Sequence, residues 1–286
     1  MASTGVSDKF IKVLSELYSN ATMKVRNQLG TTNSIEVTEG VLQGEILSPT
    51  IFALFIADLK NFLLSKGIRG ISVTKLAEIL LLAYADDIVI LVDSPAMMKR
   101  TLKVLFEYCE KNALKVNLKK TEIIVFKKGG KIKSNISFCF GKDSIKIVNR
   151  YTYLGITFTS SGLFENAAKD LVKKANVSAL STIKLITYTR LDSWAKCKRL
   201  FESLVTSIIL YSSPIWSIRH IDLLEKLQCQ FFKKLLNLPP CTPNYYVRLI
   251  NDLQSMSTKN FKLILNWINC ILIMSDEMYP KICFLD

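Results

Sequence analysis

The spacing of apolar residues predicts two helices in the first quarter of the chain. Residues 8–18 carry Phe, Val and Leu at helical intervals. A second periodic run covers residues 48–66, with Ser48 expected as its N-cap, Pro49 in its first turn and Gly67 just past its end. The first ten residues of this run are nearly all apolar, so we expect one long, buried helix.

Short strand-like runs surround these helices. Residues 22–41 alternate between apolar and polar positions around Gly30, which predicts a hairpin. Two apolar runs, 79–84 and 88–92, are separated only by the polar break at residues 85–87. These two runs are expected to pair as neighbouring strands.

A third helix and a small sheet should follow. Ser94 and Pro95 open a helical pattern that continues to about Leu114, and a turn and a strand occupy residues 115–128. Residues 136–159 contain short alternating segments typical of a small sheet. Turns are expected at Gly129-Gly130 and at Gly141.

From about Phe164 onward the pattern is helical, with breaks at Pro214 and at Pro239-Pro240. The sequence therefore predicts an α+β fold class in two regions. Residues 1–160 form an α+β part with an antiparallel sheet, and residues 161–286 form an all-helical part.

Composition and charge narrow the class of partner. The 286 residues include 38 Lys and Arg against 24 Asp and Glu, a net charge of +14, and 49% of them are apolar. This excess favours an anionic partner, most commonly nucleic acid and less commonly an anionic membrane surface. Seven dispersed cysteines and one histidine indicate a reduced, intracellular protein and argue against a zinc site. Acids within residues 76–92, the longest apolar stretch, argue against a membrane span.

Asp86 and Asp87 are the strongest candidates for chemistry. They stand side by side between two apolar strands, and a tight turn there would present both carboxylates at one edge of a sheet. Carboxylate oxygens suit Mg²⁺, which usually takes one or two of them and leaves its other positions to water and phosphates. For an isolated Asp-Asp pair, a merely solvated surface hairpin would be the simpler explanation.

The neighbouring sequence favours the metal. Four blocks occur in order: GVLQGEILSPTIFALFIADL (40–59), YADD (84–87), LKVNLKKTEIIVF (114–126) and YTYLGITF (151–158). Their order and approximate spacing resemble the reverse transcriptases of LINE-type (non-LTR) retrotransposons, in particular the jockey-like ones. In the helical half, SIILYSSPIW (207–216), LEKLQCQFFKKLLNLPP (224–240) and TPNYYVRL (242–249) extend the resemblance.

This resemblance implies part of a right-hand polymerase palm followed by a thumb and connecting helices. The implied reaction is RNA-directed DNA synthesis from deoxynucleoside triphosphates on an RNA template and a DNA primer. Tyr84, Ala85, Asp86 and Asp87 would form the metal-binding turn, with Asp86 as a direct ligand of Mg²⁺, or alternatively Mn²⁺. Asp87 would be the second acid of the metal site.

The first block would lie against the incoming nucleotide and the template through Gln43, Gly44, Ser48 and Pro49. Glycine lets a backbone approach a substrate closely, and a helix start offers free N–H groups. A loop with a helix cap would explain Ser-Pro but not the Gln-Gly before it. The pair Glu45-Ile46 departs from the small or polar residue and proline that are commoner in this family, and it adds a negative charge.

The last two blocks supply two further candidates. Lys120 would neutralise, or donate a proton to, the leaving pyrophosphate, although an ordinary surface lysine is the alternative. Asn117 is expected to fix the turn before it. Tyr153, Leu154 and Gly155 would hold the primer end, and packing of an aromatic strand on the sheet is compatible with that role.

The helical half carries many basic residues. As a set they fit a thumb that grips a duplex backbone with strong salt dependence, although each alone would be an ordinary solvated residue. They are Lys169, Lys173, Lys174, Lys184, Arg190, Lys196, Lys198, Arg199, Lys233 and Lys234.

The family's third carboxylate, on a strand before the Gln-Gly block, has no counterpart that we can identify. Asp8 is the first acid of the chain, but Ser7 and Lys9 beside it do not form a buried strand. We therefore expect an N-terminally truncated polymerase that is inactive alone, with a nuclear site of action. The alternatives are a non-catalytic nucleic-acid-binding remnant and, less favoured, a basic protein that binds another surface.

Overall fold

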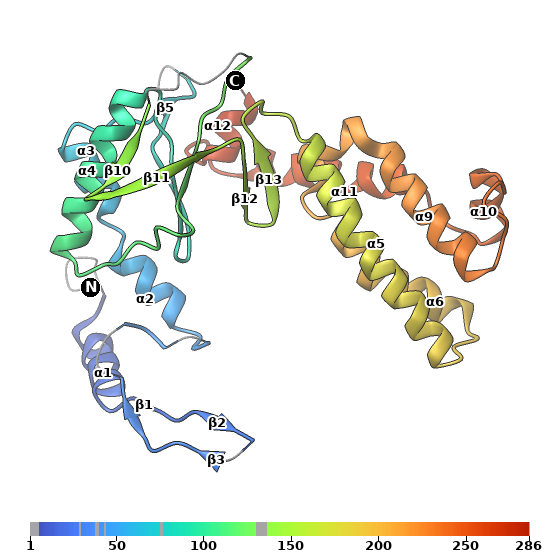
Figure 1. Ribbon diagram of the computed structural model, residues 1–286, viewed down its shortest axis with the longest axis horizontal. Coiled ribbons are helices and arrows are strands. Elements are labelled where there is room, and N and C mark those ends of the chain that lie inside the picture. Colours follow the sequence, from blue (N-terminus) through green and yellow to red (C-terminus); the bar gives the residue numbers. More distant parts are fainter. Residues whose placement is uncertain are drawn as a thin grey trace. The chain divides into compact units, whose positions relative to one another are not determined.

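The computed structural model of the chain (Figure 1) describes residues 6–28, 30–37, 40–42, 44–74, 77–129 and 136–285. It divides into two compact units, Met1–Lys115 and Val116–Asp286. Each unit has its own cluster of buried apolar residues.

The first unit alternates helices with short strands. Strand β1 pairs with β4, and β2 with β3, all antiparallel, so the predicted hairpin around Gly30 is confirmed. Two further antiparallel pairs, β5–β6 and β7–β8, follow. The elements are α1 (Asp8–Ser19), β1 (Thr22–Met23), β2 (Arg26–Asn27), β3 (Gly30–Thr31), β4 (Ile35–Glu36), α2 (Ser48–Phe55), α3 (Leu59–Ser65), β5 (Ile71–Ser72), β6 (Glu78–Ile79), β7 (Leu81–Tyr84), β8 (Asp87–Ile90) and α4 (Pro95–Lys111).

The predicted long helix over residues 48–66 is wrong: the chain forms two helices, α2 and α3, separated at Ile56–Asp58. At this break the Asp58 carboxylate accepts a hydrogen bond from the Tyr108 hydroxyl of α4 at 2.5 Å. Burial, and then this hydrogen bond, raise the pKa of Tyr108. A contact between residues 50 positions apart thus engages the polar residue at the break. The prediction of burial also fails for α2, in which only Ser48 is buried.

The core of the first unit forms between α3, α4 and the strands. Its buried members are Leu59, Leu63, Ile68, Leu80, Val104 and Tyr108. Each fully buried aliphatic side chain contributes about 1.5–3 kcal/mol of transfer free energy. Helix α4 starts as predicted, because the Ser94 hydroxyl accepts a hydrogen bond from the backbone N–H of Met97.

The second unit begins with two small sheets. Strand β11 pairs antiparallel with β10 and parallel with β9, while β12 and β13 form a separate hairpin. The turn predicted at Gly141 joins β10 to β11, whereas Gly130 lies outside the described residues. The strands are β9 (Glu122–Ile124), β10 (Phe138–Phe140), β11 (Asp143–Val148), β12 (Arg150–Tyr153) and β13 (Ile156–Thr159).

From Glu165 onward, every described secondary-structure element is helical, as predicted. The change of secondary structure thus falls near residue 160, whereas the compact units divide at Lys115, so β9–β13 belong to the same unit as the helices. The elements are α5 (Glu165–Tyr188), α6 (Trp194–Phe201), the π-helical η2 (Glu202–Thr206), α7 (Ser207–Ile209), α8 (Ser213–Trp216), the 3-10 helix η3 (Ser217–His220), α9 (Ile221–Leu235), α10 (Asn244–Ile250), α11 (Met256–Ile273) and α12 (Tyr279–Leu285).

Helix α5 contacts both α6 and α9 (Figure 1). The buried cluster of these helices includes three phenylalanine rings. The ring centroid of Phe201 lies 4.6 Å from that of Phe231 and 5.0 Å from that of Phe232. Small buried residues of α5, including Ala168 and Ala175, are fully enclosed in the same cluster. None of the helices in the described part of the chain combines the length and apolar character that a bilayer-spanning segment needs.

The seven free thiols should fall into two kinetic classes in a titration with Ellman's reagent. Burial raises the pKa of the Cys109, Cys197 and Cys229 thiols, which lowers their thiolate fraction, and it also shields them from reagent. The exposed ones are Cys139, Cys241, Cys270 and Cys283. We expect four thiols to react at pH 8 before the other three, which should react only after addition of denaturant. Seven equally fast thiols would contradict the burial of Cys109, Cys197 and Cys229.

Candidate active site

Strands β7 and β8 hold Asp86 and Asp87 at the end of a hairpin. Because Tyr84 pairs with Asp87, only Ala85 and Asp86 form the turn. The break between the strands was expected at residues 85–87, but it covers only two residues because Asp87 is already part of β8. Ala85 has a φ of +52°, in the left-handed region that favours glycine.

The hairpin turns its two faces to different surroundings. Paired residues share a face, and side chains alternate along each strand. Leu81, Ile88 and Ile90 pack on the core, so Asp87 lies on the opposite face together with its partner Tyr84. Asp86, Asp87 and Tyr84 are all exposed. One face thus anchors the hairpin while the turn presents two adjacent carboxylates to solvent.

This donor set fits a magnesium ion. Mg²⁺ is commonly held by one or two carboxylates, with water and substrate phosphates completing its shell. Asp86 and Asp87 supply two hard oxygen donors next to each other in sequence. Over the ranges that the structure describes, no group of three His, Cys, Asp or Glu side chains comes together as a metal cage.

The block before α2 is arranged differently from its prediction. Gln43 lies outside the described residues. Gly44 has a φ of +91°, in the left-handed region that favours glycine. This backbone conformation is therefore sufficient to account for a glycine at position 44. Ser48 is not the N-cap, because Leu47 occupies that position and the Ser48 hydroxyl instead donates to the Leu42 carbonyl at 2.6 Å. Pro49 lies in the first turn as predicted.

Glu45, the residue that departs from the family pattern, ties this loop to α1. Its carboxylate accepts a hydrogen bond from the Tyr18 hydroxyl at 2.6 Å and lies 3.2 Å from the Ser48 hydroxyl. The hydrogen bond to Glu45 raises the pKa of Tyr18. The extra negative charge therefore has local hydroxyl partners, whereas the neighbouring Ile46 is 92% exposed.

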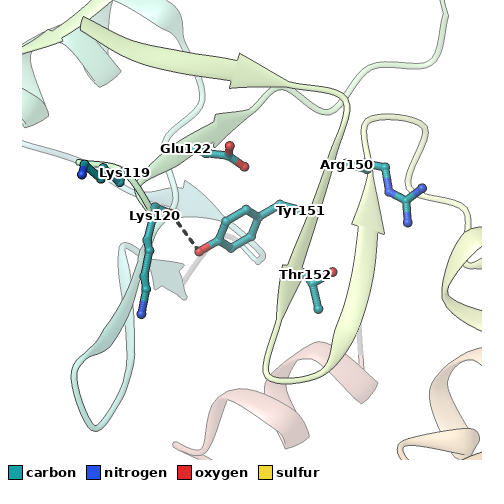
Figure 2. A pocket seen from close by; sticks show the side chains of 6 residues that line it. All are labelled: Lys119, Lys120, Glu122, Arg150, Tyr151 and Thr152. Carbon is teal, nitrogen blue, oxygen red and sulfur yellow. Dashed lines mark hydrogen bonds between the residues drawn. The ribbon is translucent and has the colours of Figure 1, made fainter. Parts of the chain in front are cut away.

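In the second unit, Lys120 borders an open hollow of about 370 Å³ (Figure 2). Its backbone carbonyl accepts a hydrogen bond of 3.4 Å from the Tyr151 hydroxyl. The turn before β9 is fixed by Asn117, as predicted, since the Asn117 backbone carbonyl accepts from the Lys120 amide and its side-chain oxygen from the Lys119 amide. The lining residues are Lys119, Lys120, Glu122, Arg150, Tyr151 and Thr152.

The charges around this hollow are unevenly compensated. Figure 2 shows the Tyr151 ring extending from β12 toward Lys120. The Arg150 side chain lies on the opposite side of β12 from Lys120. Arg150 forms an ion pair of 2.8 Å with Asp170 of α5. Among the described residues, Lys119 and Lys120 form no salt bridge, so their charges are available to an anion.

The third candidate group is the turn of the β12–β13 hairpin. Tyr153 pairs with Ile156, which leaves Leu154 and Gly155 as a two-residue turn with φ values of +46° and +83°. A residue that the sequence did not indicate as a candidate also contacts this turn. The hydroxyl of Tyr211, 57 residues further along the chain, donates a hydrogen bond to the Leu154 carbonyl at 2.7 Å.

The candidate residues therefore form two groups. The Ala85-Asp86 turn with Asp87, together with Gly44, Ser48 and Pro49, belongs to the first compact unit. Lys120 and the turn at residues 153–155 belong to the second. Within the second unit, the hydrogen bond from Tyr151 joins the Lys120 turn to the strand that leads into the Leu154-Gly155 turn.

Comparison with known proteins identifies three similar retrotransposon proteins. The chain is 29% identical over 175 residues to the "Retrovirus-related Pol polyprotein from type-1 retrotransposable element R2" of Popillia japonica, covering 59% of this chain and 28% of that protein. It is 22% identical over 220 residues to the "RNA-directed DNA polymerase from mobile element jockey" of Drosophila funebris, covering 73% of this chain and 23% of that protein.

The third relative is the "Retrovirus-related Pol polyprotein from type-2 retrotransposable element R2DM" of Drosophila melanogaster. It is 27% identical over 253 residues, which cover 85% of this chain and 23% of that protein. The chain thus spans about a quarter of the length of the relatives it matches. The family described as reverse transcriptase (RNA-dependent DNA polymerase) matches residues 4–158, more than half of the chain. The protein therefore belongs to the reverse transcriptase family, in its LINE-type, non-LTR branch.

Proposed function

We propose that this chain carries part of the palm and the thumb of an enzyme that copies RNA into DNA. The observation that supports this most directly is the β7–β8 hairpin. It exposes Asp86 and Asp87 at its turn while its other face packs on the core, and it lies within the residues that match the family. Preorganised, solvent-facing carboxylates on a packed support are one part of what metal-assisted nucleotidyl transfer requires of a palm.

In this proposal Asp86 and Asp87 hold Mg²⁺, or alternatively Mn²⁺. The bound ion supplies electrostatic stabilisation at the phosphate oxygens. The helix start at Ser48 and Pro49, with Gly44 and Gln43 before it, meets the incoming nucleotide and the template. Its backbone N–H groups, of which Pro49 contributes none, are suited to a phosphate because no side chain caps this helix start.

Lys120 neutralises the leaving pyrophosphate or donates a proton to it. Its availability is supported by the lack of a salt bridge among the described residues and by its position beside an open hollow. Tyr153, Leu154 and Gly155 contact the primer end in this scheme. The left-handed turn at Leu154-Gly155 exposes backbone at the tip of the hairpin, where a strand end can approach closely.

The helical part grips the duplex of RNA template and DNA primer. The net charge of +14 and the many lysines and arginines after residue 165 support electrostatic contact with phosphates. Deoxynucleoside triphosphates are the second substrate in this scheme, and the reaction takes place in the nucleus.

We also propose that the 286-residue chain does not catalyse synthesis by itself. The resemblance implies a third carboxylate that we could not match to any residue of this sequence. Removing one preorganised group from such a site commonly costs on the order of a hundredfold in rate. A non-catalytic nucleic-acid-binding protein is therefore the second candidate function, and the net charge alone would support it.

Primer extension on an RNA template with Mg²⁺ tests both proposals. We expect the purified chain to give no more product than Asp86→Ala, because two carboxylates alone are insufficient for the reaction. The same sample should bind an RNA–DNA primer-template, with an affinity that falls steeply as salt rises.

Asp143→Ala is the matched control, since Asp143 is an exposed acid at the start of β11 and belongs to the other compact unit. Product formed by the unchanged chain and by Asp143→Ala, but lost in Asp86→Ala, would overturn the proposed inactivity and establish the role of Asp86. A folded chain that fails to bind the primer-template at low salt would contradict the polymerase proposal itself.

A further inference from the structure

The motif SIILYSSPIW contains a tyrosine that reaches the tip of the β12–β13 hairpin. The hydroxyl of Tyr211 donates to the carbonyl of Leu154 at 2.7 Å. Its ring lies against Gly155, where an added Cβ would stand 3.3 Å from the ring atom Cε1. The contact therefore combines a hydrogen bond with close packing that glycine permits.

The Leu154 carbonyl is a natural target for such a donor. In a two-residue hairpin turn, the central residues are not part of the strand ladder, so their backbone groups need other partners. Tyr153 and Ile156 form the last pair of the ladder, and Leu154 follows directly. The Tyr211 hydroxyl supplies the missing donor from the segment between α7 and α8.

Tyr211 is itself held firmly by its neighbours. The indole N–H of Trp216, a residue that is only 3% exposed, donates to the Tyr211 carbonyl at 2.9 Å. Ser212 adopts a φ of +51°, which turns the chain between α7 and α8. The fully buried Ser217 hydroxyl lies 2.9 Å from the side-chain oxygen of Asn260 in α11. Two buried side chains thus fix the segment from which the tyrosine projects.

We propose that Tyr211 is a positioning residue for the primer-holding turn at residues 153–155. This inference rests on the proposed function of that turn. Tyr211 acts through the Leu154 carbonyl and not through contact with reacting atoms. It sets where the exposed backbone of the turn stands and so how well the chain holds the recessed 3′ end of a DNA primer on its RNA template.

The first test needs no nucleic acid. Tyr211→Phe removes the hydroxyl but keeps the ring that packs on Gly155. Tyr188→Phe is the matched control, because Tyr188 is the last residue of α5 and is 88% exposed. Amide hydrogen exchange of the free chain should become at least severalfold faster within residues 150–159 in Tyr211→Phe only. Unchanged exchange in this hairpin would overturn the positioning role.

The second test measures binding of two RNA–DNA duplexes of equal length, one with a recessed DNA 3′ end and one blunt. Loss of one neutral hydrogen bond corresponds to about a fivefold change in affinity. We expect Tyr211→Phe to bind the recessed duplex about fivefold more weakly and the blunt duplex unchanged. Equal weakening for both duplexes would overturn the specific role of Tyr211.

The two tests separate this inference from the proposal beneath it. If the unchanged chain binds the recessed and blunt duplexes equally, the primer-holding function of the turn is wrong. The exchange measurement on the free chain still decides whether Tyr211 fixes the turn. Suppose that exchange is faster in Tyr211→Phe but the unchanged chain shows no preference for the recessed duplex. Tyr211 then fixes the turn, but the turn does not hold the primer.

Discussion

Phe201→Ala should destabilise the second unit by about 3–5 kcal/mol, the usual cost of removing a buried phenylalanine ring. Phe201 is fully buried, and its ring lies within about 5 Å of two others, those of Phe231 and Phe232. Pairs of aromatic rings at such distances add about 0.5–1.5 kcal/mol beyond the area that they bury. The substitution leaves a cavity among helices that cannot collapse without moving both other rings.

The measurement is urea denaturation followed by tryptophan fluorescence. Trp194, Trp216 and Trp267 all lie in the second unit, so the signal reports on that unit. The matched control is Phe261→Ala, because Phe261 is 59% exposed on α11 and its loss should change the free energy of unfolding by about 0.5 kcal/mol or less. Equal effects of the two substitutions would refute the described core.

Gly70→Ala should disrupt the first unit by about 3 kcal/mol, at the upper end of the cost of overpacking. Its φ is not in the left-handed region, so the glycine is required by close approach instead. An added Cβ would stand 2.3 Å from the Ile79 carbonyl oxygen and 2.6 Å from the Leu80 Cα. These are backbone atoms, which cannot rotate away, so β5 and β6 must separate.

This separation should spread to the β7–β8 hairpin that carries Asp86 and Asp87, because the Leu80 carbonyl also accepts a hydrogen bond from the Leu91 amide at the base of that hairpin. Amide hydrogen exchange within residues 78–91 is the measurement. Gly40→Ala is the control, since a Cβ there would meet no atom within 4 Å and only its φ of +81° opposes alanine. That control should cost about 1–2 kcal/mol and leave residues 78–91 protected. Protection of this segment in Gly70→Ala as well would contradict the prediction.

Local patterns were sufficient to predict much of this fold. Two apolar strands around a polar break predicted the hairpin that presents Asp86, and Ser94-Pro95 predicted the start of α4. The helical second half followed from its spacing alone. These features depend on residues near one another in sequence, and such signals are carried by composition and periodicity.

The predictions that failed depend on contacts between distant residues. The break between α2 and α3 could not be predicted from an apolar run, because the hydrogen bond from Tyr108 to Asp58 joins residues 50 apart. Serine is a residue type that commonly caps helices, yet the Ser48 hydroxyl donates a hydrogen bond to the Leu42 carbonyl instead. The contact of Tyr211 with Leu154 could not be predicted either, because the motif that contains Tyr211, SIILYSSPIW, does not indicate which residues it contacts.

Efforts to make this protein more robust face a conflict at two turns. Ala85 and Leu154 both adopt left-handed backbone, which costs about 1–2 kcal/mol in a residue that is neither Gly nor Asn. Asn before Gly is the sequence that suits a two-residue turn such as Leu154-Gly155, so asparagine there would raise the melting temperature. Yet both positions lie where we propose that metal and primer meet the protein. Consensus-style thermostabilisation should therefore exclude these two residues, since the gain in robustness would come from the surface that substrate must recognise.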